Sequence, residues 1–349
     1  MPETERRARV ERLLQSARIL ADGASEAGRA LRAQLLETTG LSRENIELGL
    51  SRCLETSVSD ANLAAFVGGS AAAPRVHVLL SGNVFVAALR AIALGLAASN
   101  DVYVRASRRD PALAQALHAL GPELFRLESE LQPQPGDHFY AYGSDETLGE
   151  LRRELPRGVC FHAHGSGFGA VVVEPFTGGS DDARAIALDT ALFDQRGCLS
   201  PRVVCVAGAE AEARRVAQAL AKELAQLERE VPSGAISSAE AATRRRERDT
   251  AAYAFETFDA GGGWVSLSPD FVLPPATRSL HVCFAQEPAA LLAPFRRQLT
   301  GVAANSAQLR AGLAQQFANA RVVALGELQR PLFDVPVDRR SPRTGELLS

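Results

Sequence analysis

Apolar residues near the N-terminus recur at the spacing of an amphipathic helix. Between Thr4 and about Leu36 they form one stripe, made of Val10, Leu13, Leu14, Ala17 and Leu20. Ser42 is a good N-cap and predicts the start of a second helix that runs towards Cys53. The N-terminal part of the chain is therefore expected to be helical.

Short apolar runs alternate with helical segments in the next part of the chain. The runs predicted as strands are Arg75–Leu80, Asp101–Arg105, His138–Tyr142, Val159–His162 and Ala170–Val173. The segments predicted as helices are Val84–Ala98, Pro111–Leu120 and Asp145–Leu155. Strands that alternate with helices of about 10–15 residues indicate parallel βαβ units, so we expect an α/β fold with a doubly wound parallel sheet.

The second half of the chain repeats this alternation. Its predicted helices are Asp181–Phe193, Ala211–Glu230, one after the Pro232–Gly234 break, Ala289–Gln298 and Ser306–Ala318. Its predicted strands are Val203–Val206, Leu280–Phe284 and Val322–Leu325, with a turn between short strands at Gly261–Gly263. The polar, glycine-rich stretch Phe176–Ser180 is the expected domain junction, and the polar residues after Arg339 are expected to form a loose tail.

Composition narrows the class of protein. At roughly 150 residues per domain, 349 residues suggest two domains. With 38 Lys and Arg against 41 Asp and Glu, no basic field would gather nucleic acid or an anionic membrane. The longest apolar run, Val84–Ala98, contains Arg90 and is shorter than the roughly 20 residues of a membrane span. The N-terminus lacks the apolar centre of a signal peptide, so we expect a soluble, cytoplasmic protein.

The five cysteines do not suggest a disulfide framework or a metal site. Their number is odd, their spacing is wide, and no CxxC pair occurs. The histidines His77, His118, His138 and His281 show no metal-ligand spacing either, so no metal site is expected. A lone cysteine is usually a small buried hydrophobe, which is the role we expect for Cys53, Cys160, Cys205 and Cys283.

Cys198 is the exception, because of the residues around it. It follows Gly197 at the end of a predicted helix and precedes Pro201 and a buried strand. A catalytic thiol has to project from a rigid turn into a cleft, where its neighbours can lower its pKa. The segment Phe193–Pro201 is therefore the best candidate for the chemistry.

Four motifs, in one order along the chain, resemble the aldehyde dehydrogenase superfamily. They are Ser81–Phe85 before an apolar helix, Ala97–Ser107 with its strand that ends in a basic residue, Tyr142–Glu146, and Gln195–Cys198. Within the superfamily, Phe-Asp-Gln-x-x-Cys-Leu-Ser-Pro at Phe193–Pro201 is most similar to the fatty-acyl-CoA reductases, including the reductase component of bacterial bioluminescence. The resemblance implies an aldehyde-dehydrogenase-like fold with two doubly wound domains and parallel sheets. It also implies NAD(P)H-dependent reduction of an acyl thioester to an aldehyde.

The resemblance assigns roles to Cys198 and Asn83. The Cys198 thiolate would attack the thioester carbonyl of an acyl-CoA or acyl-carrier substrate. The Asn83 amide and the Cys198 backbone N–H would stabilise the oxyanion, and such donors are each worth roughly 3–4 kcal/mol. The other interpretation of Asn83 is an N-cap for a helix that begins at Val84.

The resemblance also places the cofactor and a proton donor. It implies NADPH, with NADH as the other choice, bound by Arg105, Ser107, Gly143, Ser144 and Gly165, where Arg105 could pair with a 2′-phosphate. A helix N-cap is the ordinary role for Ser144.

Aldehyde-oxidising members carry a water-activating glutamate in a Glu-Leu-Gly-Gly motif. The corresponding stretch, His162–Gly167, has no glutamate, which favours thioester reduction. His162 and His164 alternate onto one face of a strand, so either could protonate the thiohemiacetal oxygen; a bond to backbone is the ordinary alternative. The family's Glu-x-Phe-Gly-Pro ribose motif is also missing.

These expectations define the domain boundaries and leave two alternatives to the reductase function. Residues 1–169 would form the nucleotide-binding domain, 170–340 the catalytic domain and 341–349 a tail. One alternative is a cysteine acyltransferase or thioesterase without nicotinamide. Another is a non-catalytic family member that binds a partner such as an acyl-activating ligase, and a homo-oligomer is also compatible with the sequence.

Overall fold

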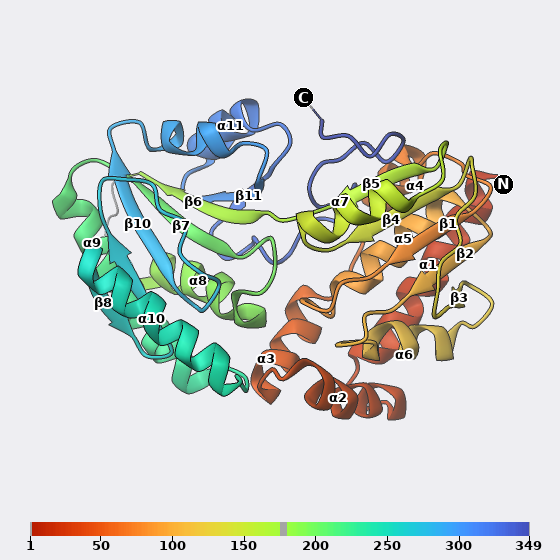
Figure 1. The fold of residues 1–349 in the computed structure, drawn as a ribbon, viewed down its shortest axis with the longest axis horizontal. Coiled ribbons are helices and arrows are strands. Elements are labelled where there is room, and N and C mark those ends of the chain that lie inside the picture. Colours follow the sequence, from red (N-terminus) through yellow and green to blue (C-terminus); the bar gives the residue numbers. More distant parts are fainter. Residues whose placement is uncertain (1, 175–179, 349) are drawn as a thin grey trace. The chain divides into compact units, whose positions relative to one another are not determined.

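The two halves of the α/β alternation form two separate sheets in the computed structural model, which describes residues 2–174 and 180–348 (Figure 1). Contacts group residues 2–39, 46–166 and 330–348 into a first unit and 40–45 and 167–329 into a second. Most of the expected junction Phe176–Ser180 lies outside the described residues. The assignment of a nucleotide-binding and a catalytic domain stays a prediction.

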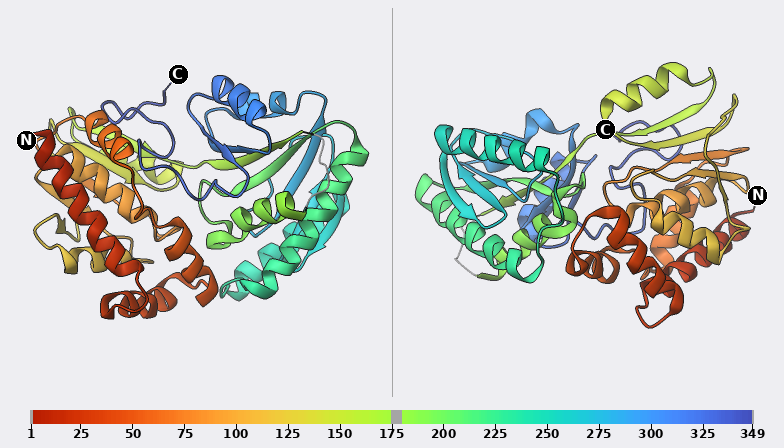
Figure 2. Two further views of the ribbon diagram at one scale, coloured as in Figure 1. Left: turned by 180° about the vertical axis from the view of Figure 1, so that it is seen from behind. Right: turned by 60° about the horizontal axis from the view of Figure 1, so that its bottom comes forward.

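The first unit is built on a five-stranded parallel sheet in the order β3-β2-β1-β4-β5. Its strands are β1 (Val76–Leu79), β2 (Val102–Arg105), β3 (Arg126–Leu127), β4 (His138–Tyr142) and β5 (Cys160–His164). Its helices are α1 (Glu3–Ala21), α2 (Glu26–Thr39), α4 (Asp60–Gly69), α5 (Ala87–Ala98), α6 (Ala112–Leu120) and α7 (Asp145–Glu154), while α3 (Arg43–Leu48) crosses the boundary between the units. In Figure 2, α1 (red) lies beside α5 (orange).

One predicted helix of the first unit is divided in two, and another begins later than predicted. The segment from Thr4 to Leu36 is two helices, because the Asp22 carboxylate accepts a hydrogen bond from Ala24 N (2.9 Å) and Ser25 Oγ accepts one from Gly28 N (2.8 Å). These side chains end α1 and cap α2. The helix expected from Val84 begins only at Ala87, so Asn83 does not cap it.

The second unit holds a seven-stranded sheet in the order β12-β11-β6-β7-β10-β9-β8. Its strands are β6 (Phe168–Val173), β7 (Pro201–Ala207), β8 (Glu256–Ala260), β9 (Gly263–Leu267), β10 (Leu280–Ala285), β11 (Leu299–Ala304) and β12 (Arg321–Ala324). Its helices are α8 (Ser180–Ala191), α9 (Glu210–Glu230), α10 (Ser238–Ala254) and α11 (Ala307–Gln316), with 3₁₀ turns at Leu192–Gln195 and Pro288–Phe295.

The second sheet is parallel except at one edge. β8 pairs antiparallel with β9 through the predicted glycine turn, where Gly261 has a φ of 75° that side chains disfavour. The expected parallel sheet is thus confirmed, and the expected turn between short strands joins β8 and β9. α8 and α9 pack against each other, and α9 covers β7 to β10 (Figure 2).

The core of the second unit explains why the central strands are so apolar. Alternate residues of β6, such as Ala170 and Val172, pack in one cluster with Leu292 and Phe317, while Val171 and Val173 point to the other face and are also buried. Strands buried on both faces need continuous apolar runs. β11 was not predicted because Thr300 and Gly301 interrupt its apolar run, although the strand is buried throughout.

The C-terminal segment differs from the loose tail that was expected. Arg340 and Leu347 form a β-bridge, and Arg340 Nη1 donates to Gly345 O (3.1 Å). Tyr140 Oη on β4 donates to Pro342 O (3.3 Å). The segment therefore belongs to the first unit, on one face of β4 and β5.

Within the described part of the chain, no helix has the length and apolar character needed to cross a bilayer.

Candidate active site

The chain makes a left-handed turn directly before Cys198. Phe193, Asp194 and Gln195 have φ angles of 53°, 52° and 62°, a conformation that costs residues with side chains about 1–3 kcal/mol each. Such strain persists only where the surroundings fix it, and it gathers at functional sites.

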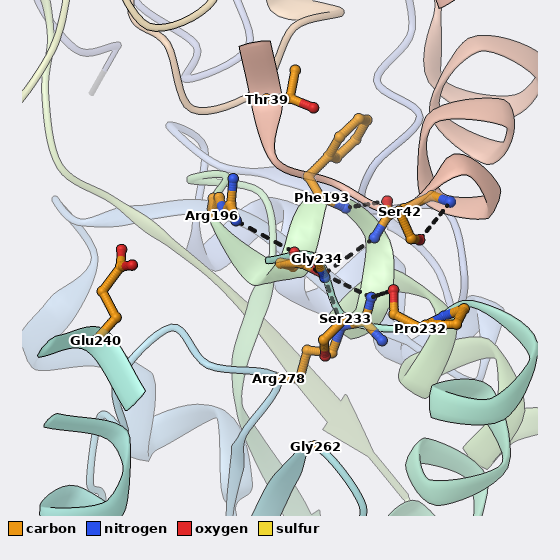
Figure 3. Close-up of polar contacts among 12 residues, drawn as sticks. Thr39, Ser42, Phe193, Arg196, Pro232, Ser233, Gly234, Glu240, Gly262 and Arg278 are labelled. Atoms are coloured by element: carbon orange, nitrogen blue, oxygen red, sulfur yellow. Dashed lines mark hydrogen bonds and ion pairs between the residues drawn. The ribbon is translucent and has the colours of Figure 1, made fainter. Parts of the chain in front are cut away.

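The Asp194 carboxylate anchors this turn and is almost fully buried. It accepts hydrogen bonds from Arg278 Nη2 (2.7 Å) and Nε (3.1 Å), from Gly234 N (3.1 Å) and from Asn45 Nδ2 (3.3 Å). Arg196 Nη2 lies 3.4 Å away. Figure 3 shows Phe193, Arg196, Gly234 and Arg278 around the turn. A buried carboxylate needs such partners, so this network fixes the turn.

Two carboxamides hold the turn's backbone. Asn45 Oδ1 accepts from Phe193 N (2.8 Å). Gln195 Nε2 donates to the carbonyls of Pro201 (2.7 Å) and Ser279 (2.7 Å), and Gln195 Oε1 accepts from Ser279 N (2.9 Å). These side chains satisfy backbone groups that the irregular turn leaves without helix or strand partners.

Cys198 itself is exposed, whereas Cys53, Cys205 and Cys283 are buried as predicted. Thr300 Oγ1 donates to the Cys198 carbonyl. Gly167 passes close by: a Cβ there would lie 2.5 Å from Thr300 Cγ2 and 3.8 Å from Cys198 Cβ. The second unit thus presents an exposed thiol on an anchored turn, which meets the condition for a nucleophile.

In the first unit, the predicted residues lie at the carboxyl ends of the strands. β1 pairs with β2 on one side and β4 on the other, so the point where the strand order reverses lies between β1 and β4. Open α/β sheets bind nucleotides at this point. Asn83 is exposed in the loop after β1, and the adjacent Gly82 is tight against the loop after β2, since a Cβ there would lie 2.4 Å from Ser107 Oγ.

The predicted cofactor-binding residues differ in their burial and hydrogen-bond partners. Arg105 is half-buried at the end of β2, and Ser107 Oγ accepts from Arg109 N (3.2 Å). Gly143 N already donates to His164 O (3.2 Å), and Ser144 caps α7 by accepting from Thr147 N (3.2 Å). The N-cap interpretation of Ser144 is confirmed.

Gly165 lies against the Asp145 carboxylate. Asp145 Oδ1 accepts from Ser166 N (2.9 Å), and a Cβ on Gly165 would lie 2.1 Å from that oxygen. A carboxylate at the N-terminus of α7 is stabilised by the helix dipole and opposes a phosphate there.

His164 lies beside a buried carboxylate. Its Nδ1 is 3.0 Å from Asp338 Oδ2, its ring stacks on Tyr142 with centroids 4.5 Å apart, and its side chain is 9% exposed. Burial would raise the pKa of Asp338, but His164 and Arg340 outweigh it through charge and hydrogen bonds and lower that pKa to about 2. His164 Nε2 has no hydrogen-bond partner among the described residues. A histidine oriented in this way can donate a proton from Nε2.

His162 has different surroundings on the same strand face. Its Nε2 is 3.2 Å from His138 Nδ1 and 3.3 Å from Cys160 Sγ, and its ring stacks on Tyr140 with centroids 4.1 Å apart. Burial, with the nearby positive charges, lowers the pKa of His162 to about 3. The expected backbone bond is not its contact here, and Cys160 is half-buried with polar partners instead of a hydrophobic role.

Residues 126–329, which include β5 and the Cys198 turn, match the family model described as acyl-CoA reductase (LuxC). The chain belongs to the LuxC acyl-CoA reductase family. The resemblance seen in the sequence is thereby confirmed. A comparison with curated protein sequences gives no significant match.

Solved structures show which fold this LuxC-family chain has. It is similar to an oxidoreductase from Marinobacter aquaeolei, with 11% identity, a TM-score of 0.71 and coverage of 95% of this chain and 79% of that one. An NAD-dependent benzaldehyde dehydrogenase from Corynebacterium glutamicum has 14% identity, a TM-score of 0.70 and coverage of 95% and 82%. A glyceraldehyde-3-phosphate dehydrogenase from Methanocaldococcus jannaschii, complexed with NADP, has 11% identity and a TM-score of 0.67. The match covers 93% of this chain and 81% of that one. The predicted aldehyde-dehydrogenase-like α/β fold is confirmed.

Membership of this family supports an oxidoreductase of the acyl reductase type.

Sequence reasoning missed several residues of this LuxC-family site. Asp194 stands in the quoted motif, but its role was not assigned. Its partners Asn45 and Arg278 lie far away in sequence, and Asp338 is in a segment without periodicity. The sequence did offer one sign of a role for Asp194, because a charged residue stands only four positions before the candidate nucleophile Cys198.

Proposed function

We propose that this protein reduces an acyl thioester, of the acyl-CoA class, to an aldehyde through a covalent acyl-Cys198. The exposed Cys198 on a strained turn fixed by Asp194 and Arg278 is the observation that carries the proposal. Membership of the LuxC acyl-CoA reductase family supports the substrate class.

In the first step, the Cys198 thiolate attacks the thioester carbonyl carbon. A carbon–sulfur bond forms, the carbonyl electrons move to oxygen, and the Cys198 N–H stabilises the oxyanion. The Asn83 amide is the second donor that the family resemblance implies. The oxyanion then collapses, the bond to the leaving sulfur breaks, and CoA departs as a thiolate. The acyl group stays on Cys198.

In the second step, the acyl group is reduced. A nicotinamide held by the first unit would supply hydride chemistry for this step. His164 Nε2 would donate a proton to the oxygen of the thiohemiacetal on Cys198. When the carbon–sulfur bond breaks, the hydroxyl proton returns to His164, and the products are the aldehyde and the Cys198 thiolate. We assign the proton to His164 because its Nε2 has no hydrogen-bond partner among the described residues, whereas His162 Nε2 contacts His138 and Cys160.

The residues after β2 fit the adenosine end of a nicotinamide dinucleotide. Arg105 and the exposed Arg108 place positive charge at the carboxyl end of this strand, close to the point where strand order reverses. A guanidinium there pairs with a 2′-phosphate, which favours NADPH over NADH. Ser107 belongs to the same loop. Gly143, Ser144 and Gly165 fit a phosphate site less well. The Gly143 N–H already donates to His164 O, the Ser144 hydroxyl accepts from Thr147 N, and Gly165 lies against the Asp145 carboxylate.

The absence of a glutamate in His162–Gly167 also supports reduction. Without a general base to activate water, the acyl-cysteine hydrolyses slowly, so it persists until it is reduced. A thioesterase or acyltransferase with the same acyl-Cys198 would form no aldehyde and would consume no nicotinamide.

The test is to incubate the full chain with acyl-CoAs of graded chain length and with NADPH or NADH. Intact-protein mass spectrometry without nicotinamide should show one added acyl group, and NADPH should discharge it as aldehyde. Cys198→Ala should abolish both, whereas Cys53→Ala, at a buried cysteine in the first unit, should retain them. Acylation at another cysteine, or turnover by Cys198→Ala, would reject the mechanism.

A further inference from the structure

Three potential metal ligands meet on the face of β4 and β5. His138 on β4 and Cys160 on β5 are register partners, and His162 lies two residues further along β5 on the same face. The three ligand atoms all lie within 4.8 Å of one another. His138 is 8% exposed and His162 is 1% exposed.

Two of the three separations are close to those of a tetrahedral site. A Zn²⁺ ion binds imidazole nitrogen at about 2.0–2.1 Å and thiolate sulfur at about 2.3 Å, so ligand atoms around it lie roughly 3.3–3.6 Å apart. His138 Nδ1 and His162 Nε2 are 3.2 Å apart, and Cys160 Sγ is 3.3 Å from His162 Nε2. One nitrogen from each ring and the sulfur thus lie close enough together for one ion to contact all three after small side-chain rotations.

The C-terminal segment closes this cluster on one side. The carbonyl of Arg343 lies 3.3 Å from Cys160 Sγ, and Tyr140, whose hydroxyl donates to Pro342 O, stacks on His162. Gly345 has a φ of 73°, and a Cβ on it would lie 3.1 Å from His162 Nδ1. The segment can approach His162 this closely because residue 345 is glycine.

We propose that His138 Nδ1, His162 Nε2 and Cys160 Sγ bind one transition-metal ion of the Zn²⁺ class. Imidazole nitrogen and thiolate sulfur are the ligands that Zn²⁺ prefers, and two histidines with one cysteine are an established donor set. The fourth position falls to a water molecule or to the Arg343 carbonyl. The site is separate from Cys198 and does not depend on the proposed reduction.

Metal binding moves two protons off the ligand atoms and releases one of them. Without metal, one proton is shared between the facing ring nitrogens, and the thiol keeps its own. When the ion binds, the shared proton moves to the far nitrogen of one ring, the thiol proton goes to solvent, and three metal–ligand bonds form. No oxidant or reductant is required.

The test uses Co²⁺ as a spectroscopic probe of the full chain after treatment with a chelator. The Cys198→Ser variant is the background, because it removes the exposed thiol. Co²⁺ should bind at about one ion per chain and give tetrahedral visible bands with a thiolate-to-cobalt charge-transfer band. Zn²⁺ should displace it and raise the Tm.

Variants assign the ligands. Adding Cys160→Ser should abolish the charge-transfer band. Adding His138→Gln should lower the affinity for Zn²⁺ by more than the roughly 10- to 100-fold that is lost when a residue hydrogen-bonded to a ligand is removed. X-ray absorption on the Zn²⁺-loaded background protein should show one sulfur and two imidazoles, and it needs no variant at the cluster. An oxygen-only environment, or a band that persists in Cys160→Ser, overturns the proposal.

Discussion

Arg278 and Asp194 form a buried ion pair that holds the turn before Cys198, with Nη2 and Oδ1 2.7 Å apart and side chains 3% and 5% exposed. Arg278 Nη1 also contacts Glu228 Oε2 at 2.8 Å. Arg278→Met would leave the Asp194 charge buried without its main partner. We expect the free energy of unfolding to fall by about 3–5 kcal/mol, measured by denaturant titration.

Asp194→Asn makes this a double-mutant cycle. The asparagine removes the uncompensated charge, so the double variant should lose less stability than the two single losses combined. Arg248→Met breaks an exposed pair with Asp259 and should change stability by less than about 1 kcal/mol. Strictly additive losses would show that Arg278 acts through Glu228 and packing alone.

Gly167 sets the space beside Cys198. A Cβ there would lie 2.5 Å from Thr300 Cγ2 and 3.0 Å from the Gln298 carbonyl. Gly167→Ala should therefore lower stability by about 1–3 kcal/mol and slow alkylation of Cys198 by iodoacetamide. Gly149, in the middle of α7, has open space around it, so Gly149→Ala should raise stability by about 0.5–1 kcal/mol and leave alkylation unchanged. Equal effects at both positions would contradict this assignment.

The regular parts of the fold were predictable because local patterns determine them. His138–Tyr142 is β4 as predicted, and Ser42 Oγ accepts a hydrogen bond from Asn45 N (3.2 Å) at the start of α3. Buried strands need apolar runs, and helix starts need short polar caps, so both leave a signal within a few residues.

The contacts that build the candidate sites were not predictable in this way. Arg278 reaches Asp194 across 84 positions, from one irregular segment to another. His138 reaches His162 across 24 positions through the register of β4 and β5, which no spacing rule encodes. The spacing of His138 therefore gave no sign of a metal site. Cys198 stood out because its signal is a local motif.

Asp338 is expected to position His164. Asp338→Asn keeps the shape of the side chain but removes the charge that orients His164 Nδ1, so proton donation from Nε2 should suffer. Since general acid catalysis contributes about 10²–10⁴-fold, we expect aldehyde release to slow by roughly 10- to 100-fold. Acylation of Cys198 should keep its rate, and acyl-enzyme should accumulate in rapid-quench mass spectrometry. An equal fall in both steps would point to a structural role for Asp338.

Asp110, at the start of α6, should make stability depend on pH. Burial raises its pKa to about 6 despite hydrogen bonds from Ala112 and Thr38, while an unfolded Asp has a pKa near 3.9. The folded state therefore holds a proton that the unfolded state loses, and this stabilisation, full below about pH 4, disappears as pH rises through about 6.

Asp110→Asn keeps an uncharged group there. It should exceed the wild type by about 1–3 kcal/mol at pH 7.5 and match it near pH 4, by denaturant titration at each pH. Asp249→Asn, at an exposed position of α10, should stay within about 0.5 kcal/mol at both pH values. A difference between Asp110→Asn and wild type that does not change with pH would show that burial leaves the Asp110 carboxyl ionised throughout.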